Sequence, residues 1–353
     1  MVAKSGPTWR QPAAGAGLRS EEGAPLFLDV VGLVLVGVAA AWMAVVGAVT
    51  GTDSSGVVAL LVAAAAVYAG ARALSRLHPL VVPAAIVGAT FALWLAGPDR
   101  FLSRQPNAYP LGYANANGEF LVHAAVAALL IAAGLPARRG ARFVAGGAAV
   151  VLGLLPFASG SLAAGALGVV VLAIGLGTPK GGSGRATVAA LAAISGLALA
   201  TTVLVATAHS EEQGGPGGTA RVIEETVTER RVVLWNEALG LMGENPSAGI
   251  GVGRFEHESP IARGEEDIRW VPNAFLEQGA EAGVPGLILA ILLAAWGFAR
   301  LWVARGPGWV TAIGAASWGT LVIHACMDYA VHFPAVPLAA AAVLGAATSD
   351  SWE

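Results

Sequence analysis

Arg231 is the residue of this sequence whose chemistry best suits phosphate binding, because a planar guanidinium donates two parallel hydrogen bonds to one phosphate. It stands four residues before Trp235, in a stretch whose apolar residues recur at helical spacing until Asn245-Pro246 stops the pattern. We therefore expect an amphipathic helix with both side chains on one face. Two interpretations of each residue stay open. Arg231 binds substrate or lipid headgroups, and Trp235 stacks on a sugar or anchors the helix at the membrane interface.

Three alternating glycines follow that helix at positions 249, 251 and 253, and Arg254 comes directly after them. Backbone N–H groups exposed in such a loop can hold an anion. Glycines more commonly serve turn geometry. No strand precedes the loop, so a dinucleotide-binding fingerprint is not indicated.

A second short helix is predicted to begin at Pro272-Asn273, since proline suits the first helical position. Glu277 and Glu281 lie one turn apart on it, and Gly283 ends it. The helix leads directly into the next apolar segment, which places it at the membrane surface.

His324 and Asp328 lie four residues apart within an apolar segment, so they face the same side at membrane depth. Ionisable groups there are costly unless they are paired or face a water-filled cavity. The two interpretations are a His–Asp pair that locks two helices together and a catalytic or proton-relay role. Asp29 and Glu119 lie near the ends of predicted spans, where we expect their side chains to reach water.

The composition indicates that membrane-spanning helices hold these candidate residues in place. Hydrophobic residues make up 56% of the chain and charged residues 12%, and the mean hydropathy is +0.68, whereas soluble domains are about 25% charged. About 20 apolar residues cross a bilayer as helix. We predict an all-α, polytopic integral membrane protein with about ten transmembrane helices, at 27–49, 56–74, 79–97, 119–137, 141–158, 161–178, 186–208, 284–303, 309–330 and 333–348.

One large external loop separates the seventh and eighth predicted helices. The expected organisation is a disordered cytoplasmic tail (1–25), helices one to seven (26–208), the external loop with its amphipathic helices (209–283), helices eight to ten (284–348) and a cytoplasmic tail (349–353). Cytoplasmic loops retain Lys and Arg, and 12 of the 20 basic residues fall on one face when the amino terminus is inside. We therefore expect both termini in the cytoplasm and the loop outside.

Charge and ligand chemistry exclude several functions. The predicted loop holds 14 acidic and 6 basic residues, a net charge near −8, so it lacks the basic surface that a nucleic-acid partner needs. The single cysteine, Cys326, lies within the ninth span and has no intrachain partner. The histidines are scattered without ligand spacing, so we expect no metal site and no cofactor.

The order of these motifs resembles the O-antigen ligase and O-antigen polymerase superfamily of bacterial polytopic membrane glycosyltransferases. The resemblance covers roughly residues 85 to 348. Its motifs here are Gly112-Tyr113-Ala114-Asn115-Ala116-Asn117, Arg231-x-x-x-Trp235, Gly249-x-Gly251-x-Gly253, Asn273-x-x-Leu276, Glu281-x-Gly283-Val284-Pro285-Gly286, and His324-x-x-x-Asp328 followed by Phe333-Pro334.

The resemblance implies glycan transfer from a polyprenyl-pyrophosphate carrier to an acceptor hydroxyl on a glycan or lipid. The reaction would take place at the outer face of the bacterial cytoplasmic membrane, among membrane lipid, in cell-surface polysaccharide biosynthesis. Arg231 would stabilise the leaving pyrophosphate, since a preorganised cation lowers the barrier as that charge grows. Further substrate-binding candidates are Arg254, Arg269, Asn273, Trp235, Asn115 and Asn117. The two asparagines near residue 115 have the alternative role of capping the fourth span.

The sequence departs from the family pattern at two places. The second short helix of the family usually begins with His-Asn, but Pro272 precedes Asn273 here, so the proton acceptor is unassigned. The candidates for that role are His257, Glu281, His324 and Asp328. Ser159-Gly160-Ser161-Leu162 also lacks the arginine that relatives often carry after serine.

Two further hypotheses follow from these departures and from the ionisable residues of the ninth span. One is a catalytically lapsed relative that binds a lipid-linked glycan or a partner enzyme. The other is a transporter or flippase, which we would expect to show internal repeats and interrupted spans.

Overall fold

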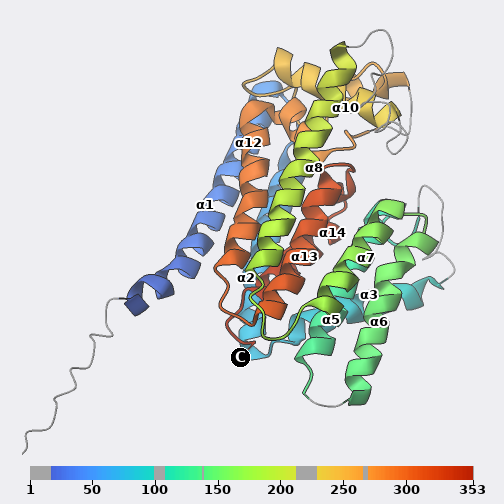
Figure 1. Cartoon of the computed structure of the whole chain (residues 1–353). Helices are drawn as coiled ribbons and strands as arrows, with labels where there is room; N and C mark the ends of the chain where they lie inside the picture. Colours follow the sequence, from blue (N-terminus) through green and yellow to red (C-terminus); the bar gives the residue numbers. More distant parts are fainter. Residues whose placement is uncertain (1–16, 99–107, 137–138, 212–228, 265–268, 353) are drawn as a thin grey trace, which may run out of the picture.

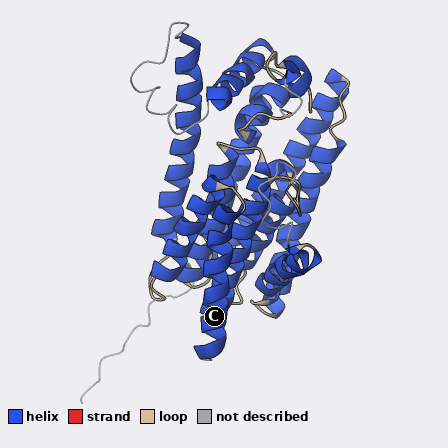
Figure 2. Cartoon of the chain, turned by 90° about the vertical axis from the view of Figure 1, so that its right-hand side faces the viewer, coloured by secondary structure: helices blue, strands red, loops and turns tan. Residues whose placement is uncertain are grey.

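The chain is a bundle of helices. The computed structural model describes residues 17–98, 108–136, 139–211, 229–264 and 269–352, and within these ranges every regular element is helical. Most helix axes run along the length of an elongated bundle (Figures 1 and 2). The prediction of an all-helical chain is confirmed for the described residues. Residues 1–16 of the predicted amino-terminal tail and 212–228 of the predicted loop lie outside them.

Helices occupy all ten positions at which spans were predicted. They are α1 (Gly17–Thr50), α2 (Ser55–Leu77), α3 (Val81–Ala96), α5 (Ala114–Gly134), α6 (Arg139–Ala158), α7 (Leu162–Gly177), α8 (Arg185–Glu211), α12 (Ala274–Trp302), α13 (Gly308–Ala325) and α14 (Ala335–Ala347). The shorter elements are α10 (Glu229–Glu244), α11 (Phe255–Glu258) and the 3₁₀ turns η1 (Ala262–Gly264) and η2 (Ala330–His332).

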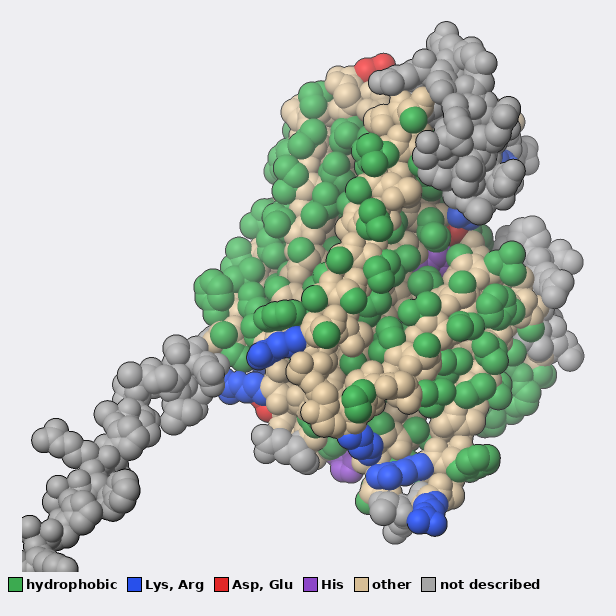
Figure 3. All heavy atoms as spheres, viewed as in Figure 1, with side chains coloured by type: hydrophobic (Ala, Val, Ile, Leu, Met, Phe, Trp, Pro, Cys, Tyr) green, Lys and Arg blue, Asp and Glu red, His purple; other side chains and the backbone are tan. Residues whose placement is uncertain are grey.

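The surface of the bundle suits lipid. Six described helices, α1, α2, α5, α6, α8 and α12, are long and apolar enough to cross a membrane, while α3, α7 and α14 are apolar but shorter. Large apolar side chains such as Leu33, Phe143 and Leu162 are more than two-thirds exposed. Hydrophobic side chains cover the flanks, and Lys and Arg gather at the lower end (Figure 3). Soluble proteins rarely expose so much apolar surface, so these features indicate a membrane protein. The total of ten spans remains a prediction.

The centre of the bundle is built around α5 and α13. Side chains of α5 are buried from Ala116 to Leu130, and so are most of those of α13. Small residues let neighbouring helices approach closely: a Cβ at Gly118 would lie 2.8 Å from the Cβ of Ala164 on α7. The ionisable residues on α5 and α13 are therefore held deep inside the bundle.

A layer of short helices covers one end of the bundle (Figure 1, top). There α10 packs against α8 and α12 and ends at Glu244, directly before the predicted stop at Asn245. Helix α12 is interrupted at Gly283 (φ 70°, ψ −173°), where the predicted second short helix ends and the span begins. A Cβ at Gly283 would lie 2.7 Å from the Pro246 carbonyl oxygen, so the break requires glycine.

The last described residues pack on the opposite end of the bundle. The ring of Trp352 is buried, lies edge-on to Trp309 at 5.5 Å and donates a hydrogen bond to the Ala346 carbonyl at 2.8 Å. Residues 349–352, predicted as a tail, thus lie against the helices.

Candidate functional site

The carboxylate of Asp328, just beyond the end of α13, joins three separate parts of the chain. Its Oδ2 accepts hydrogen bonds from the Tyr113 hydroxyl at 2.9 Å and from Asn115 Nδ2 at 2.6 Å, at the start of α5. Arg231 Nη2 on α10 lies 3.2 Å from the same oxygen. The other oxygen, Oδ1, is buried and has no hydrogen-bond partner among the described residues. We call Tyr113, Asn115, Arg231 and Asp328 the Asp328 cluster.

The Asp328 cluster fixes an arginine at the edge of the bundle. The side chain of Arg231 is 30% exposed and that of Asp328 only 1%. Arg231 Nη1 also donates to the Met327 carbonyl, so the guanidinium is held from two sides. Burial and the nearby Asp328 charge raise the pKa of the Tyr113 hydroxyl, which therefore stays protonated as a donor. The result is a preorganised cation with one open side.

Aromatic rings pack beside the Asp328 cluster. Tyr113 stacks on Tyr329 at 4.7 Å and on Phe333 at 5.4 Å between ring centroids. Trp270, in the segment before α12, stacks on His332 at 4.8 Å and lies 5.3 Å from Tyr329. These five rings form an aromatic wall at the covered end of the bundle. Tyrosine and tryptophan combine flat apolar faces with a polar tip, which suits a sugar ring.

His332 connects this wall to a groove. Its Nε2 lies 2.7 Å from Glu277 Oε2 on α12. Burial acts to lower the pKa of His332, but the Glu277 carboxylate outweighs it and raises that pKa. Both side chains line a groove of about 570 Å³ whose other walls are mostly apolar, including Trp42, Phe275 and Leu321. The aromatic wall and the apolar groove thus share His332.

A second polar cluster lies deeper, between α5 and α13. His324 Nδ1 lies 2.5 Å from Glu119 Oε2, and His123 Nε2 lies 3.8 Å from Glu119 Oε1. His123 Nδ1 is 2.9 Å from Ser317 Oγ. All three ionisable side chains are fully buried. We call Glu119, His123 and His324 the buried triad.

The buried triad corrects two predictions. Glu119 does not reach water, because α5 begins at Ala114 and places Glu119 more than a turn inside a buried helix. His324 pairs with Glu119 rather than with Asp328, because α13 ends at Ala325 and Asp328 lies beyond it. Asp29, also expected to reach water, instead bonds to Tyr68, Arg72 and Arg300.

Two other predicted substrate-binding residues, Trp235 and Asn273, stabilise the fold. Trp235 is 2% exposed and donates to the Pro272 carbonyl at 2.9 Å, so it is neither an interfacial anchor nor a free sugar platform. Asn273 is buried and caps α12 by accepting from Phe275 and Leu276 N–H, both at 3.0 Å. Its amide donates to the Cys326 carbonyl at 2.7 Å, which ties α12 to α13.

Asn117 organises the segment before α5. Its amide donates to the carbonyls of Ala108 and Tyr109, and its oxygen accepts from the Leu111 N–H. It is 1% exposed. Neither Asn117 nor Asn115 caps α5, because no side chain caps that helix. Of the two asparagines, only Asn115 meets the Asp328 cluster.

The glycine loop, residues 245–254, packs against α12. Its glycines at positions 249, 251 and 253 have φ of 67°, 101° and 68°. Ile250 and Gly251 N–H donate to the carbonyls of Ala280 and Glu281 at 2.9 and 3.0 Å, so these groups are not free to bind an anion. Glu281 is buried, and its Oε1 accepts from Phe255 N–H at 3.3 Å, which holds the loop rather than a substrate.

The remaining predicted residues face solvent. Arg254 pairs with Glu258 at 2.6 Å with its side chain 44% exposed. His257 is 65% exposed and lies 3.4 Å from Glu256. Arg269 is also exposed. The structure thus gathers Arg231, Asn115 and Asp328 and leaves Arg254, His257 and Arg269 on the outer surface.

The sequence matches no protein-family model and none of the curated proteins with which it was compared.

Proposed function

We propose that this chain is a membrane glycosyltransferase of the O-antigen ligase or polymerase type. It would transfer a glycan from a polyprenyl-pyrophosphate carrier to an acceptor hydroxyl at the outer face of the bacterial cytoplasmic membrane. The observation that carries the proposal is the meeting at Asp328 of Tyr113, Asn115 and Arg231, which come from distant segments. Each of these segments holds a motif that resembles that superfamily.

The cluster meets two demands of the reaction. Arg231 offers a fixed positive charge to the pyrophosphate, whose charge grows as the bond to the sugar breaks. Asp328 Oδ1 would accept the proton of the acceptor hydroxyl, since the other carboxylate oxygen is already bonded three times; because Oδ1 is buried, this requires the carboxylate to become accessible when the substrates bind. The acceptor oxygen then bonds to the anomeric carbon, and the electron pair of the broken bond leaves on the pyrophosphate. This assignment replaces the histidine absent at Pro272.

The surroundings fit the rest of the donor. The aromatic wall of Tyr113, Trp270, Tyr329, His332 and Phe333 offers stacking surfaces to the sugars. The apolar groove that meets it at His332 suits an isoprenoid tail.

Replacing Arg231 tests the proposal. A strain of the source bacterium lacking this gene would be complemented with wild type, Arg231→Ala or Arg231→Lys, and its surface polysaccharide resolved by chain length and acceptor. We expect Arg231→Ala to lower transfer about 10²-fold to 10³-fold and Arg231→Lys to restore part of it, because lysine keeps the charge but not the fork.

Arg254→Ala is the matched control, because Arg254 is also paired with a carboxylate but faces solvent directly before α11. The proposal predicts a normal profile for this variant at equal protein level. An unchanged profile for Arg231→Ala would contradict the proposal and favour the lapsed relative.

The buried triad supports a second candidate function, proton-coupled transport, since ionisable residues at membrane depth commonly mark proton relays. Substrate counterflow by the purified protein in liposomes, lost in Glu119→Gln, would support transport. Absence of counterflow by the wild-type protein, together with glycosyl transfer that persists in Glu119→Gln, would exclude it.

A further inference from the structure

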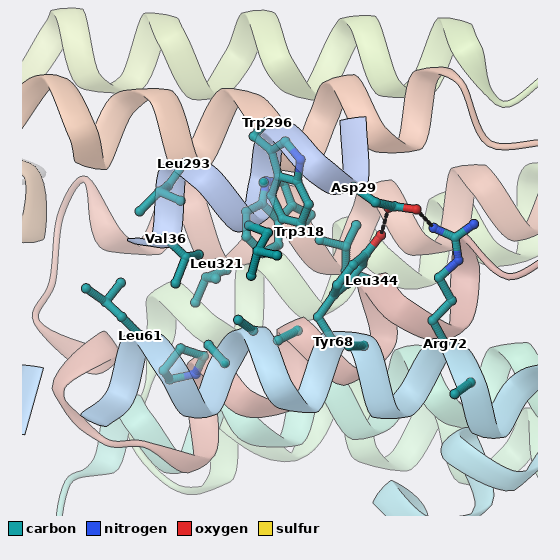
Figure 4. A pocket seen from close by; sticks show the side chains of 18 of the residues that line it. Asp29, Val36, Leu61, Tyr68, Arg72, Leu293, Trp296, Trp318, Leu321 and Leu344 are labelled. Carbon is teal, nitrogen blue, oxygen red and sulfur yellow. Dashed lines mark hydrogen bonds and ion pairs between the residues drawn. The ribbon is translucent and has the colours of Figure 1, made fainter. Parts of the chain in front are cut away.

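A groove on the flank of the bundle has a cationic end that the proposed reaction does not use. A cavity of about 390 Å³ lies between α1 and α2, and its floor is formed by Trp296, Trp318 and Leu321 (Figure 4). That volume lies within the range of small-molecule sites, about 300–1,000 Å³. Leu33 on its rim is 68% exposed, so the cavity opens to the surroundings of the bundle.

The polar end of this groove lies between the first half of α1, at Asp29, and the last turns of α2. Asp29 and Arg72 face one another there, with Tyr68 donating to the Asp29 carboxylate at 2.7 Å (Figure 4). Arg76, one turn beyond Arg72 on α2, also lines the cavity and is exposed. The rest of the lining is almost entirely apolar. The groove is therefore amphiphilic, with its charges at one end.

Positive side chains outnumber negative ones at that end of the groove. The Asp29 carboxylate forms ion pairs with two guanidinium groups, those of Arg72 and Arg300, and Arg300 is fully buried. Asp350 lies 3.9 Å from Arg72 with its side chain 47% exposed. With Arg76 included, three cations face two anions among the described side chains that line or contact this end of the groove. Arginine does not lose its proton in proteins, so one positive charge is left over.

The geometry also leaves a donor for a ligand. Arg72 is 8% exposed, and its Nε has no hydrogen-bond partner among the described residues. Buried polar atoms are normally bonded, and an unmade bond costs about 1–3 kcal/mol. A phosphate at this position would satisfy that atom and the surplus charge together.

We infer that the α1–α2 groove binds an anionic phospholipid of the neighbouring leaflet. Its phosphate contacts Arg72 and Arg76, and one acyl chain lies along the apolar floor toward Leu61. A headgroup with one negative charge matches the one surplus positive charge. The headgroup site is separate from the Asp328 cluster, which lies at the opposite end of the bundle, but the apolar floor shares Leu61, Trp318 and Leu321 with the groove assigned to the isoprenoid tail.

The test uses the purified full-length chain in neutral detergent, titrated with phosphatidylglycerol or with phosphatidylcholine of the same acyl chains. Bound lipid is counted by native mass spectrometry. We expect wild type to prefer phosphatidylglycerol, and Arg76→Gln to weaken that lipid's binding about fivefold, as for one arginine near a membrane surface.

Arg139→Gln is the matched control, since Arg139 is an exposed arginine that opens α6 at the same end of the bundle. It should bind both lipids as wild type does. Ala65→Phe fills the cavity without touching the arginines and should lower binding of both lipids.

Three results would overturn the inference. They are equal affinity of wild type for the two lipids, equal effects of Arg76→Gln and Arg139→Gln, and displacement of phosphatidylglycerol from this groove by a lower concentration of a polyprenyl phosphate.

Discussion

Arg231 and Asp328 lie 97 positions apart in the sequence and meet because α10 packs across the end of the bundle beside α13. The chemistry of Arg231 was readable from its residue type and its place on a predicted helix. Its partner was not, because a pairing between distant segments has no local signal. Tyr113 illustrates the same limit: it stands between two motif residues, yet only the fold shows it bonded to Asp328.

The His332–Glu277 pair predicts a dependence of stability on pH. Because the pKa of His332 is raised in the folded protein, the pair stabilises fully below the unfolded histidine pKa of about 6.5. That contribution is lost as pH rises through the folded pKa. Thermal unfolding of wild type and Glu277→Gln should therefore differ more at about pH 6 than at about pH 9, by about 1–2 kcal/mol.

A suitable control for that comparison is Glu258→Gln, which removes a carboxylate from the exposed pair with Arg254. Its difference from wild type should be small at both pH values. A Glu277→Gln difference that grows with pH would contradict the assignment.

At the scale of elements, α12 and the glycine loop form one unit. Backbone hydrogen bonds join the loop of residues 245–254 to the short amino-terminal part of α12. In the opposite direction, the Val284 N–H donates to the Pro246 carbonyl at 2.9 Å. The sequence predicted the helix end before Asn245 and the break at Gly283 because these rest on local backbone preferences. It did not predict that the loop and α12 pair, since that depends on tertiary contacts.

Two glycines of this loop give a matched pair of substitutions. Gly249 and Gly253 have nearly equal φ, 67° and 68°. A Cβ at Gly249 would lie 2.3 Å from the Glu281 carbonyl carbon, whereas one at Gly253 meets nothing within 4 Å. Gly253→Ala should cost about 1 kcal/mol for the left-handed backbone, and Gly249→Ala about 3 kcal/mol because a clash is added.

Hydrogen exchange of residues 245–283 would measure both substitutions in the same segment. Equal loss of protection in the two variants would show that the contact between Gly249 and α12 contributes little.

At the scale of the whole molecule, the apolar pattern predicted where helices lie but not which of them are central. Span length follows from bilayer thickness, so runs of apolar residues locate helices well. Whether a polar residue near a helix end is buried depends on the neighbouring helices. Glu119 shows this: α13 and α7 pack around the start of α5 and bury it.

Orientation in the membrane is a prediction of the basic-residue pattern, and cysteine labelling tests it. In a Cys326→Ala background, a membrane-impermeant maleimide added to intact spheroplasts should label Arg254→Cys and leave Arg139→Cys unlabelled. Both should react after lysis. Cys326 is buried, so wild type itself should react little. The reverse labelling pattern would place the Asp328 cluster in the cytoplasm and contradict the proposed transfer.

The rim of the α1–α2 groove is exposed on the flank of the bundle rather than at its ends. A ligand therefore arrives by lateral diffusion within the bilayer, and its effective concentration is a mole fraction of the surrounding lipid. Diluting the protein in buffer leaves this occupancy unchanged, whereas adding detergent micelles lowers it. Function measured after delipidation would then report an emptied groove, and returning lipid rather than concentrating protein would restore it.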